Sequence, residues 1–379
     1  SATAQGILVD TGTNISMTNV TTNHIASTNG TPGDVQGISF LTSAKSIDMS
    51  NVAMNSNSGA AVHGLKLAAG ENVFLQDCFA DQNSGTTSAY GIEITGSVNA
   101  LDAINITGNA NAASAGVAGG FKATAATAVK IDGISADYNQ AAGGTNEVVG
   151  IEFATSGSSV SLKNATANNN TSAAGNSTGV RIAAGLAVSM DNVAANYNLC
   201  ANDKIVRGIH FDTSLQSAHL KNLSADSNYA ATPATGMLAM GIHIEQPLSV
   251  EINDISASRN IGYDRSYGLF LDGQSSAGSN TSVNNAILNG NTSNSTATAM
   301  AAVDTTATVS KHLPVNVFDA ITGFTSVLEG AFGLYVYQIN SCLLDGVDAS
   351  RNSGVRAGGM YVTTCDDCTI QNSKTSFQV

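Results

Sequence analysis

Hydrophobic and polar residues alternate with a period of two along most of the chain, in short runs that glycine, serine and asparagine interrupt. In residues 150–153, for example, Ile151 and Phe153 share one face and Glu152 points the other way, as in a β-strand. Two further short runs follow before residue 170. Three short strands, each followed by a turn, predict one coil of a solenoid.

The same sequence repeat recurs along the whole chain. Each copy begins with a glycine, which is followed by alternating apolar residues. Successive glycines are 26 to 33 residues apart, and a degenerate copy lies near Ala301. The chain lacks the helical periodicity of helical repeats and the tryptophan–aspartate signatures of propeller blades. The remaining repeat architecture is a parallel β-helix with coils about 4.8 Å apart. We therefore expect one all-β array over residues 1–379, of about thirteen coils, without a linker. The opening glycines are Gly6, Gly37, Gly64, Gly91, Gly120, Gly150, Gly179, Gly208, Gly241, Gly268, Gly333 and Gly359.

Two columns of asparagine accompany the repeat. Asparagine tolerates left-handed backbone angles, and stacked amides can bond to the coils above and below, so we expect both columns to be structural. The first column is Asn19, Asn51, Asp77, Asn105, Asn164, Asn192, Asn222 and Asn372. The second, six residues later, is Asn57, Asn83, Asn170, Asn198, Asn228 and Asn291.

Residues 301–332 depart from the pattern and add Pro314, Phe318 and Phe324. We expect an irregular coil or an excursion against the side of the solenoid, with its phenylalanines filling core. The chain starts without methionine at Ser1 and stops inside another copy of the repeat, which predicts a piece of a longer protein.

Composition narrows the class of protein. Of 379 residues only 11% are charged, none is tryptophan, and the net charge is −13 without a basic cluster. Nucleic-acid binding requires clustered Lys and Arg and is not expected. No apolar stretch reaches the roughly 20 residues of a membrane span. The small polar residues favour an extracellular or cell-surface location.

Five cysteines do not suggest a dense disulfide framework. Cys365 and Cys368 form a CxxC without a second pair or a nearby histidine, so we expect small stacked residues and no zinc site. Cys342 and Cys368 each lie nine residues after their opening glycine. We expect these two to stack on adjacent coils without a bond between them.

The segments at 333–352 and 358–373 resemble right-handed parallel β-helix proteins of the pectate-lyase-like superfamily. That group includes polysaccharide lyases and hydrolases, phage tailspikes, and bacterial adhesins and autotransporter passengers. The resemblance implies a right-handed winding and extends over essentially the whole chain, but a fold does not select one activity.

The enzyme signatures of that superfamily are missing. The only Asp-Asp is Asp366-Asp367, and the Asn-Thr-Asp, Gly-His-Gly and Arg-Ile-Lys signatures of polygalacturonase-like hydrolases do not occur. The arginine setting of pectate lyases and the Asp-Pro-His-Glu of alginate epimerases are also absent. Few aromatics are available as platforms for sugar. An enzyme is thus the less favoured interpretation.

The variable position two residues after each glycine predicts an outward stripe. Its charges alternate in sign from Lys66 to Arg181, which suits cross-strand pairing, and we interpret it as register control and solubility. The stripe reads Ser39, Lys66, Glu93, Lys122, Glu152, Arg181, His210, His243, Phe270, Tyr335 and Tyr361.

The next outward position adds Asp212, Glu245 and Asp272 beside His210 and His243. Two imidazoles and three carboxylates on adjacent coils form the candidate binding or acid–base cluster, and such donors suit a transition metal. The alternative is that the side chains splay into water and each histidine pairs with the acid of its own strand. We expect no cofactor and no metal.

These observations favour a secreted or surface-displayed structural or adhesive stalk segment. Its partner would be a glycan or protein on a host or neighbouring cell. A carbohydrate-active enzyme with a non-standard site at the histidine cluster and a virion or phage fibre segment are the alternatives.

Overall fold

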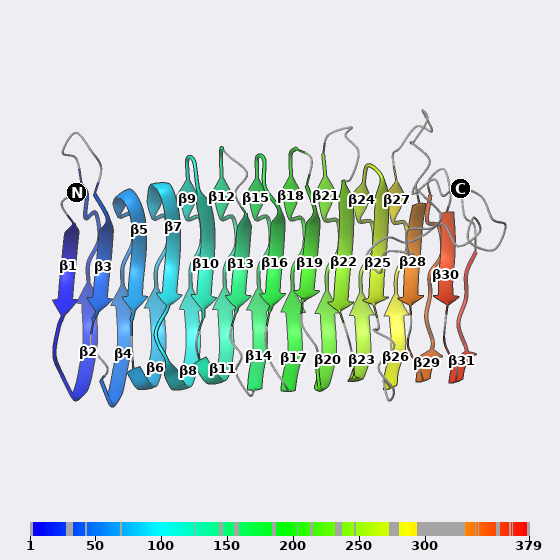
Figure 1. The fold of residues 1–379 in the computed structure, drawn as a ribbon, viewed down its shortest axis with the longest axis horizontal. Helices are drawn as coiled ribbons and strands as arrows, with labels where there is room; N and C mark the ends of the chain where they lie inside the picture. Colours follow the sequence, from blue (N-terminus) through cyan, green and yellow to red (C-terminus); the bar gives the residue numbers. More distant parts are fainter. Residues whose placement is uncertain are drawn as a thin grey trace, which may run out of the picture.

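The computed structural model consists of strands and turns stacked along one axis (Figure 1). The residues that it describes are 3–27, 33–41, 44–68, 70–124, 126–143, 147–154, 159–183, 187–202, 204–212, 215–231, 237–245, 248–272, 280–293, 330–337, 339, 341–353, 357–363, 365 and 367–376. They form an all-β parallel solenoid of about 10 turns, and no helix occurs among them. The predicted fold class is confirmed.

The long strands form two parallel sheets, which we call sheet A and sheet B. The long strands of sheet A are β1 (Ala4–Val9), β3 (Val35–Phe40), β5 (Ser58–Leu67), β7 (Ser84–Ile94), β10 (Val117–Ala123), β13 (Val148–Phe153), β16 (Ser177–Ile182), β19 (Val206–Phe211), β22 (Leu238–Glu245), β25 (Arg265–Asp272), β28 (Gly330–Tyr337) and β30 (Ala357–Thr363).

Sheet B has 12 strands, stacked in chain order. They are β2 (Asn14–Thr21), β4 (Ser46–Ala53), β6 (Gly70–Phe79), β8 (Val98–Thr107), β11 (Ala126–Ser135), β14 (Ser159–Thr166), β17 (Ala187–Ala194), β20 (Ser217–Ser224), β23 (Ser249–Ser256), β26 (Asn280–Ile287), β29 (Ser341–Asp345) and β31 (Asp367–Gln371).

Short third strands lie along the upper edge of Figure 1 and extend sheet A. They are β9 (Ala112–Ala113), β12 (Gln140–Ala141), β15 (Thr171–Ser172), β18 (Leu199–Cys200), β21 (Tyr229–Ala230), β24 (Ile261–Gly262) and β27 (Thr292–Ser293). The expected degenerate copy near Ala301 and most of the irregular segment 301–332 lie outside the described residues. Its last residues enter β28, where Phe332 is buried.

The alternation of apolar and polar residues determines which side chains lie inside the solenoid. Ile151 and Phe153 of β13 and Val160 and Leu162 of β14 all point inward and are buried, as predicted. They belong to one continuous apolar core that extends along the stack. The opening glycine sits where the strand of sheet A bends: a Cβ on Gly208 would lie 2.7 Å from the carbonyl oxygen of Gly241. Only glycine allows coils to approach this closely there.

The two asparagine columns have different roles. Asn164, Asn192 and Asn222 of the first column are exposed and have φ of 50°, 59° and 52°, the left-handed region that asparagine tolerates. The second column is fully buried. Each of its amides donates to the side-chain oxygen of the next coil, as Asn170 does to Asn198 at 3.1 Å and Asn198 to Asn228 at 3.0 Å. The same oxygen also accepts a backbone N–H.

The structure shows more stacked polar residues than the sequence predicted. Asn111, Asn139, Asn260 and Asn352 complete the buried column. A third column, which we did not anticipate, accepts the backbone N–H of the following coil through side-chain oxygens. It is Asn23, Asn55, Asp81, Asn109, Asp137, Asn168, Asn196, Asp226, Ser258, Asn289 and Ser350.

Cys342 and Cys368 are register partners on β29 and β31, which confirms their predicted stacking. The expectation that the CxxC provides only small stacked residues is wrong, because Cys365 and Cys368 form a disulfide. Their Cα atoms lie 5.9 Å apart, a separation usual for disulfides. Cys78, Cys200 and Cys342 are buried thiols outside this disulfide.

We predict that Asn170→Ala lowers the free energy of unfolding by about 3 kcal/mol, because two donors of Asn139 lose their acceptor in a buried site. Chemical denaturation measures the change. The matched control is Asn192→Gly, at an exposed left-handed position, which we expect to change stability by less than about 0.5 kcal/mol. Equal effects in the two variants would contradict the distinction between the columns.

Thiol counting tests the cysteine assignment. Burial raises the pKa of the Cys78 and Cys342 thiols to about 12, so these two should not react with a thiol reagent at pH 8 in the native protein. Unfolding without reductant should release three thiols, and unfolding with reductant five. Mass spectrometry should locate the bond within the peptide that holds both Cys365 and Cys368. A peptide linked through Cys342 would contradict the assignment.

Candidate functional site

The predicted outward stripe exists in sheet A, but it is not a solvated surface. Arg181 pairs in register with His210, His210 with His243, and His243 with Phe270. Most side chains of the stripe are nevertheless buried: Ser39, Glu93, Glu152, His210, His243, Phe270 and Tyr335. Neighbours on adjacent coils lie about 4.8 Å apart, so they stack on and shield one another. The interpretation as a solubilising ladder is therefore wrong for these positions.

From Lys122 to Arg181 the stripe is a chain of ion pairs. Lys122 Nζ lies 3.2 Å from Glu152 Oε2, and Arg181 Nη1 lies 3.6 Å from Glu152 Oε1. Arg181 also contacts Glu147 at 3.2 Å and Asp212 at 2.6 Å. The predicted pairing of alternating charges is confirmed here. Burial by itself would lower the pKa of Arg181, but the three surrounding carboxylates raise it overall, so the guanidinium stays charged.

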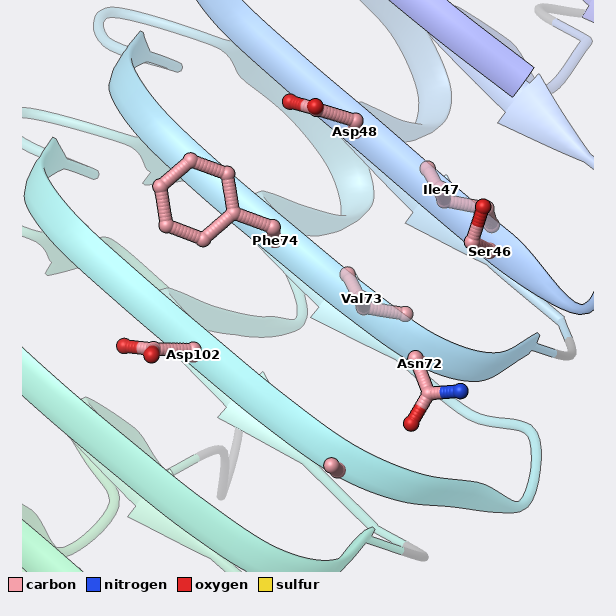
Figure 2. Close-up of a pocket in the computed structure, with 8 residues that line it drawn as sticks. Ser46, Ile47, Asp48, Asn72, Val73, Phe74 and Asp102 are labelled. Carbon is pink, nitrogen blue, oxygen red and sulfur yellow. The ribbon is translucent and has the colours of Figure 1, made fainter. Parts of the chain in front are cut away.

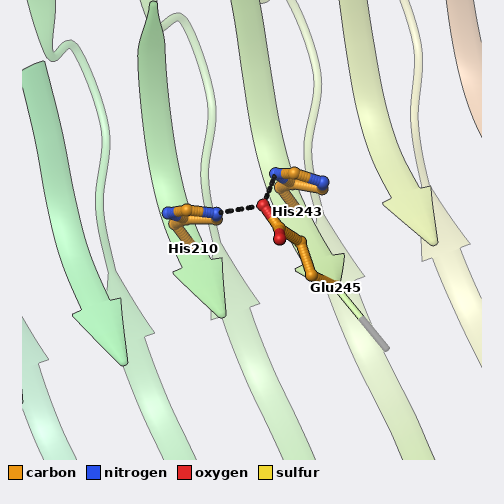
Figure 3. Close-up of side chains that lie close together, drawn as sticks. All are labelled: His210, His243 and Glu245. Carbon is orange, nitrogen blue, oxygen red and sulfur yellow. Dashed lines mark hydrogen bonds and ion pairs between the residues drawn. The ribbon is translucent and has the colours of Figure 1, made fainter. Parts of the chain in front are cut away.

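Three of the five candidate residues converge where the chain of ion pairs ends (Figure 3). Nε2 of His210 lies 3.1 Å from Oε1 of Glu245, and Nδ1 of His243 lies 3.8 Å from the same oxygen. The two imidazoles stack with centroids 4.9 Å apart and planes 10° apart. His243 stacks equally on Phe270, at 4.7 Å. A single carboxylate thus faces two buried imidazoles.

The other two candidates take different positions. Asp212 follows His210 by two residues, yet it accepts hydrogen bonds from Arg181 of the preceding coil at 2.9 and 2.6 Å. Asp212 therefore pairs with Arg181, and the alternative interpretation, in which each histidine pairs with the acid of its own strand, is wrong at His210. It holds for His243 and Glu245, which lie on one strand with Nδ1 and Oε1 3.8 Å apart. Asp272 lies opposite Glu245 in register and is 3% exposed. Both carboxylates flank the cluster of His210, His243 and Glu245, which we call the histidine cluster.

Arg207 and Glu147 also contribute to this region, and sequence reasoning missed them. Arg207 directly precedes the opening Gly208 and is partly buried. Burial lowers its pKa, while the charges of Glu245 and Glu147 oppose that shift. Burial likewise raises the pKa of Glu147, against the attraction of Arg181. For Arg207 the signal in the sequence was a charged residue next to a repeat glycine. That position lies outside the stripe, which consists of the residues two positions after each glycine.

Beyond Phe270 the outer face of sheet A becomes aromatic. Phe270 and Tyr335 pack edge to face at 5.1 Å, and Tyr335 lies 5.0 Å from Tyr361. Burial raises the pKa of the Tyr267 and Tyr335 phenols, so both remain neutral. The stripe therefore changes along the axis from ion pairs through histidines to a packed aromatic cluster.

The outer face of sheet B differs, because it carries small polar side chains in the open. Asp48, Phe74 and Asp102 are register partners on β4, β6 and β8. They line a depression of about 280 Å³ together with Ser46 and Asn72. Figure 2 shows the Phe74 ring lying between the two carboxylates. A partly exposed ring with acceptors on either side forms what we call the Phe74 depression.

A similar but smaller depression, of about 210 Å³, lies farther along the same face. His219 and Glu251 line it and pair at 3.1 Å, with both side chains at least half exposed. None of its lining residues is phenylalanine, tyrosine or tryptophan. The two depressions thus differ mainly in the ring of Phe74.

Comparison of the chain with family models, with curated proteins and with solved structures finds no match. Within the described ranges, no helix is both long and apolar enough to cross a membrane. Any assignment of function therefore rests on the chemistry of the faces described above.

We predict that Glu93 contributes to the loss of folding stability at acidic pH. Burial alone would raise the pKa of Glu93, but the hydrogen bond and charge of His63, 3.0 Å away, lower it overall, with help from Lys66 and Lys122. A lowered carboxyl pKa stabilises the fold above the unfolded value of about 4.3, and that stabilisation is lost as the pH falls through the folded value.

The melting temperature should therefore fall less between pH 6 and pH 3.5 in Glu93→Gln than in the parent protein. Glu71→Gln, at an exposed glutamate, serves as the control and should follow the parent curve. If Glu93→Gln also follows the parent curve, the His63–Glu93 pair does not contribute as described.

Proposed function

We propose that this chain is an extended structural and adhesive segment that binds a surface glycan through the outer face of sheet B. The proposal includes the more specific expectations from sequence: a right-handed β-helix of about thirteen coils, similar to the adhesins and passengers of the pectate-lyase-like superfamily, displayed outside the cell. The observation that carries it is the Phe74 depression on a straight stack of small polar residues.

The chemistry of the Phe74 depression suits a sugar. The C–H face of a pyranose packs on an aromatic ring, and its hydroxyls donate hydrogen bonds to carboxylates and amides. Phe74 provides the ring, Asp48 and Asp102 provide acceptors on opposite sides, and Asn72 provides an amide. Because the depression is shallow and open, we expect weak binding at each site and adhesion through many copies.

Rigidity supports the same role. Backbone hydrogen bonds and the buried asparagine ladder connect each described coil to the next, which holds the outer face of sheet B in a fixed geometry. A surface that is already ordered loses little conformational entropy when it binds. An adhesive segment that spans a distance benefits from both properties.

A glycan array followed by titration of the best binder tests this function. Phe74→Ala should weaken binding at least about fivefold, because truncation of an aromatic that anchors a ligand costs more than about 1 kcal/mol. Ile104→Ala is the matched control: Ile104 is an exposed apolar residue of β8 that does not line the depression, and its loss should leave binding unchanged.

Two results would reject the proposal. One is that no glycan binds above background. The other is that a glycan binds equally well to Phe74→Ala, which would place the binding surface elsewhere. Preference for a lysine-rich peptide over every glycan would identify the depression as a cation site, since Asp48 and Asp102 would also attract an ammonium group.

A further inference from the structure

The histidine cluster has a donor set that the adhesive role does not use. One ring nitrogen from His210, one from His243 and a carboxylate oxygen of Glu245 all lie within 4.8 Å of one another. The first two residues are register partners on β19 and β22, and Glu245 ends β22. We propose that His210, His243 and Glu245 bind one divalent transition-metal ion, with Zn²⁺ as the test case.

The donors match the preferences of this ion. Zn²⁺ takes imidazole nitrogen and carboxylate oxygen at about 2.0–2.1 Å in tetrahedral geometry, and three protein ligands leave one position for water or an external ligand. Tetrahedral bonds of that length place ligand atoms about 3.3 Å apart. The three donors must therefore move closer by up to about 1.5 Å when the ion binds.

The stack determines which side chain moves. An imidazole lone pair lies in the ring plane, so two parallel rings cannot direct their lone pairs at one ion. His243 is held on both faces, by His210 at 4.9 Å and by Phe270 at 4.7 Å. Because His243 is held in this way, we expect His210 and Glu245 to make the movement that the ion requires.

Carboxylates beside the histidine cluster favour a cation, whereas the charge of Arg207, which interacts with Glu245, opposes one. Glu245 lies opposite Asp272 in register, and like charges on neighbouring strands repel. The nearby guanidinium of Arg181 is already engaged by Glu147, Glu152 and Asp212. Although both histidines are buried, the Glu245 side chain is 20% exposed, which gives an ion access from solvent. A cation at this point reduces the repulsion between the carboxylates.

The test uses the full chain after treatment with a chelator. Calorimetric titration with Zn²⁺ should show one ion per chain, and the ion should remain after desalting. His210→Ala, His243→Ala and Glu245→Gln should each weaken binding more than about 100-fold, since loss of even an outer-shell partner costs about 10- to 100-fold.

Two histidines that pair with a glutamate elsewhere provide matched controls. His63→Ala and His219→Ala remove the partners of Glu93 and Glu251 and should leave zinc binding unchanged. Circular dichroism verifies that each variant folds. If the alanine variants fail to fold, Glu245→Gln, which keeps the size and shape of the side chain, decides the outcome by itself.

Absence of stoichiometric zinc in the parent protein would overturn the inference. Retention of zinc by a folded Glu245→Gln variant would also overturn it, because the ion would then lie elsewhere. The same holds for a folded variant that carries both His210→Ala and His243→Ala. Phe74→Ala should retain the zinc site, so failure of the glycan proposal and failure of the metal proposal can be told apart.

Discussion

Parallel stacking in register places every residue about 4.8 Å from its counterpart in the next coil, and the rest of the structure depends on this constraint. Identical apolar side chains stack without penalty, so the core repeats from coil to coil. Identical asparagines stack with a gain, because each amide both donates and accepts. Identical charges stack at a cost, since like charges at this distance repel.

The repulsion between like charges explains why the residue types of the stripe change along the outer face of sheet A. Where the stripe is charged, signs alternate through Lys122, Glu152 and Arg181. Where it is aromatic, from Phe270 onward, no charge needs compensation. Histidine suits the junction because a neutral imidazole stacks like an aromatic ring and still bonds to a carboxylate. His210 and His243 do both.

The sequence alone predicted what depends on repetition. Alternation identified the inward residues, and glycine spacing gave the register that pairs His210 with His243 and Cys342 with Cys368. It did not predict which neighbour a long side chain selects: Asp212 lies two residues from His210, but the stronger cation Arg181 is one coil away. Nor did it predict burial of the stripe, since this depends on how neighbouring side chains cover one another.

The same reasoning separates the two faces by what they can do. On sheet A the stacked side chains fill the space between coils, so a ligand must be small enough to enter between imidazoles, and a metal ion meets that condition. On sheet B serine and asparagine leave the backbone thinly covered, and the ring of Phe74 stands between two acids without a stacking partner in register. A ring that its own column does not cover is available to a ligand from outside, and its flat face suits one that is extended and polar, such as a sugar chain.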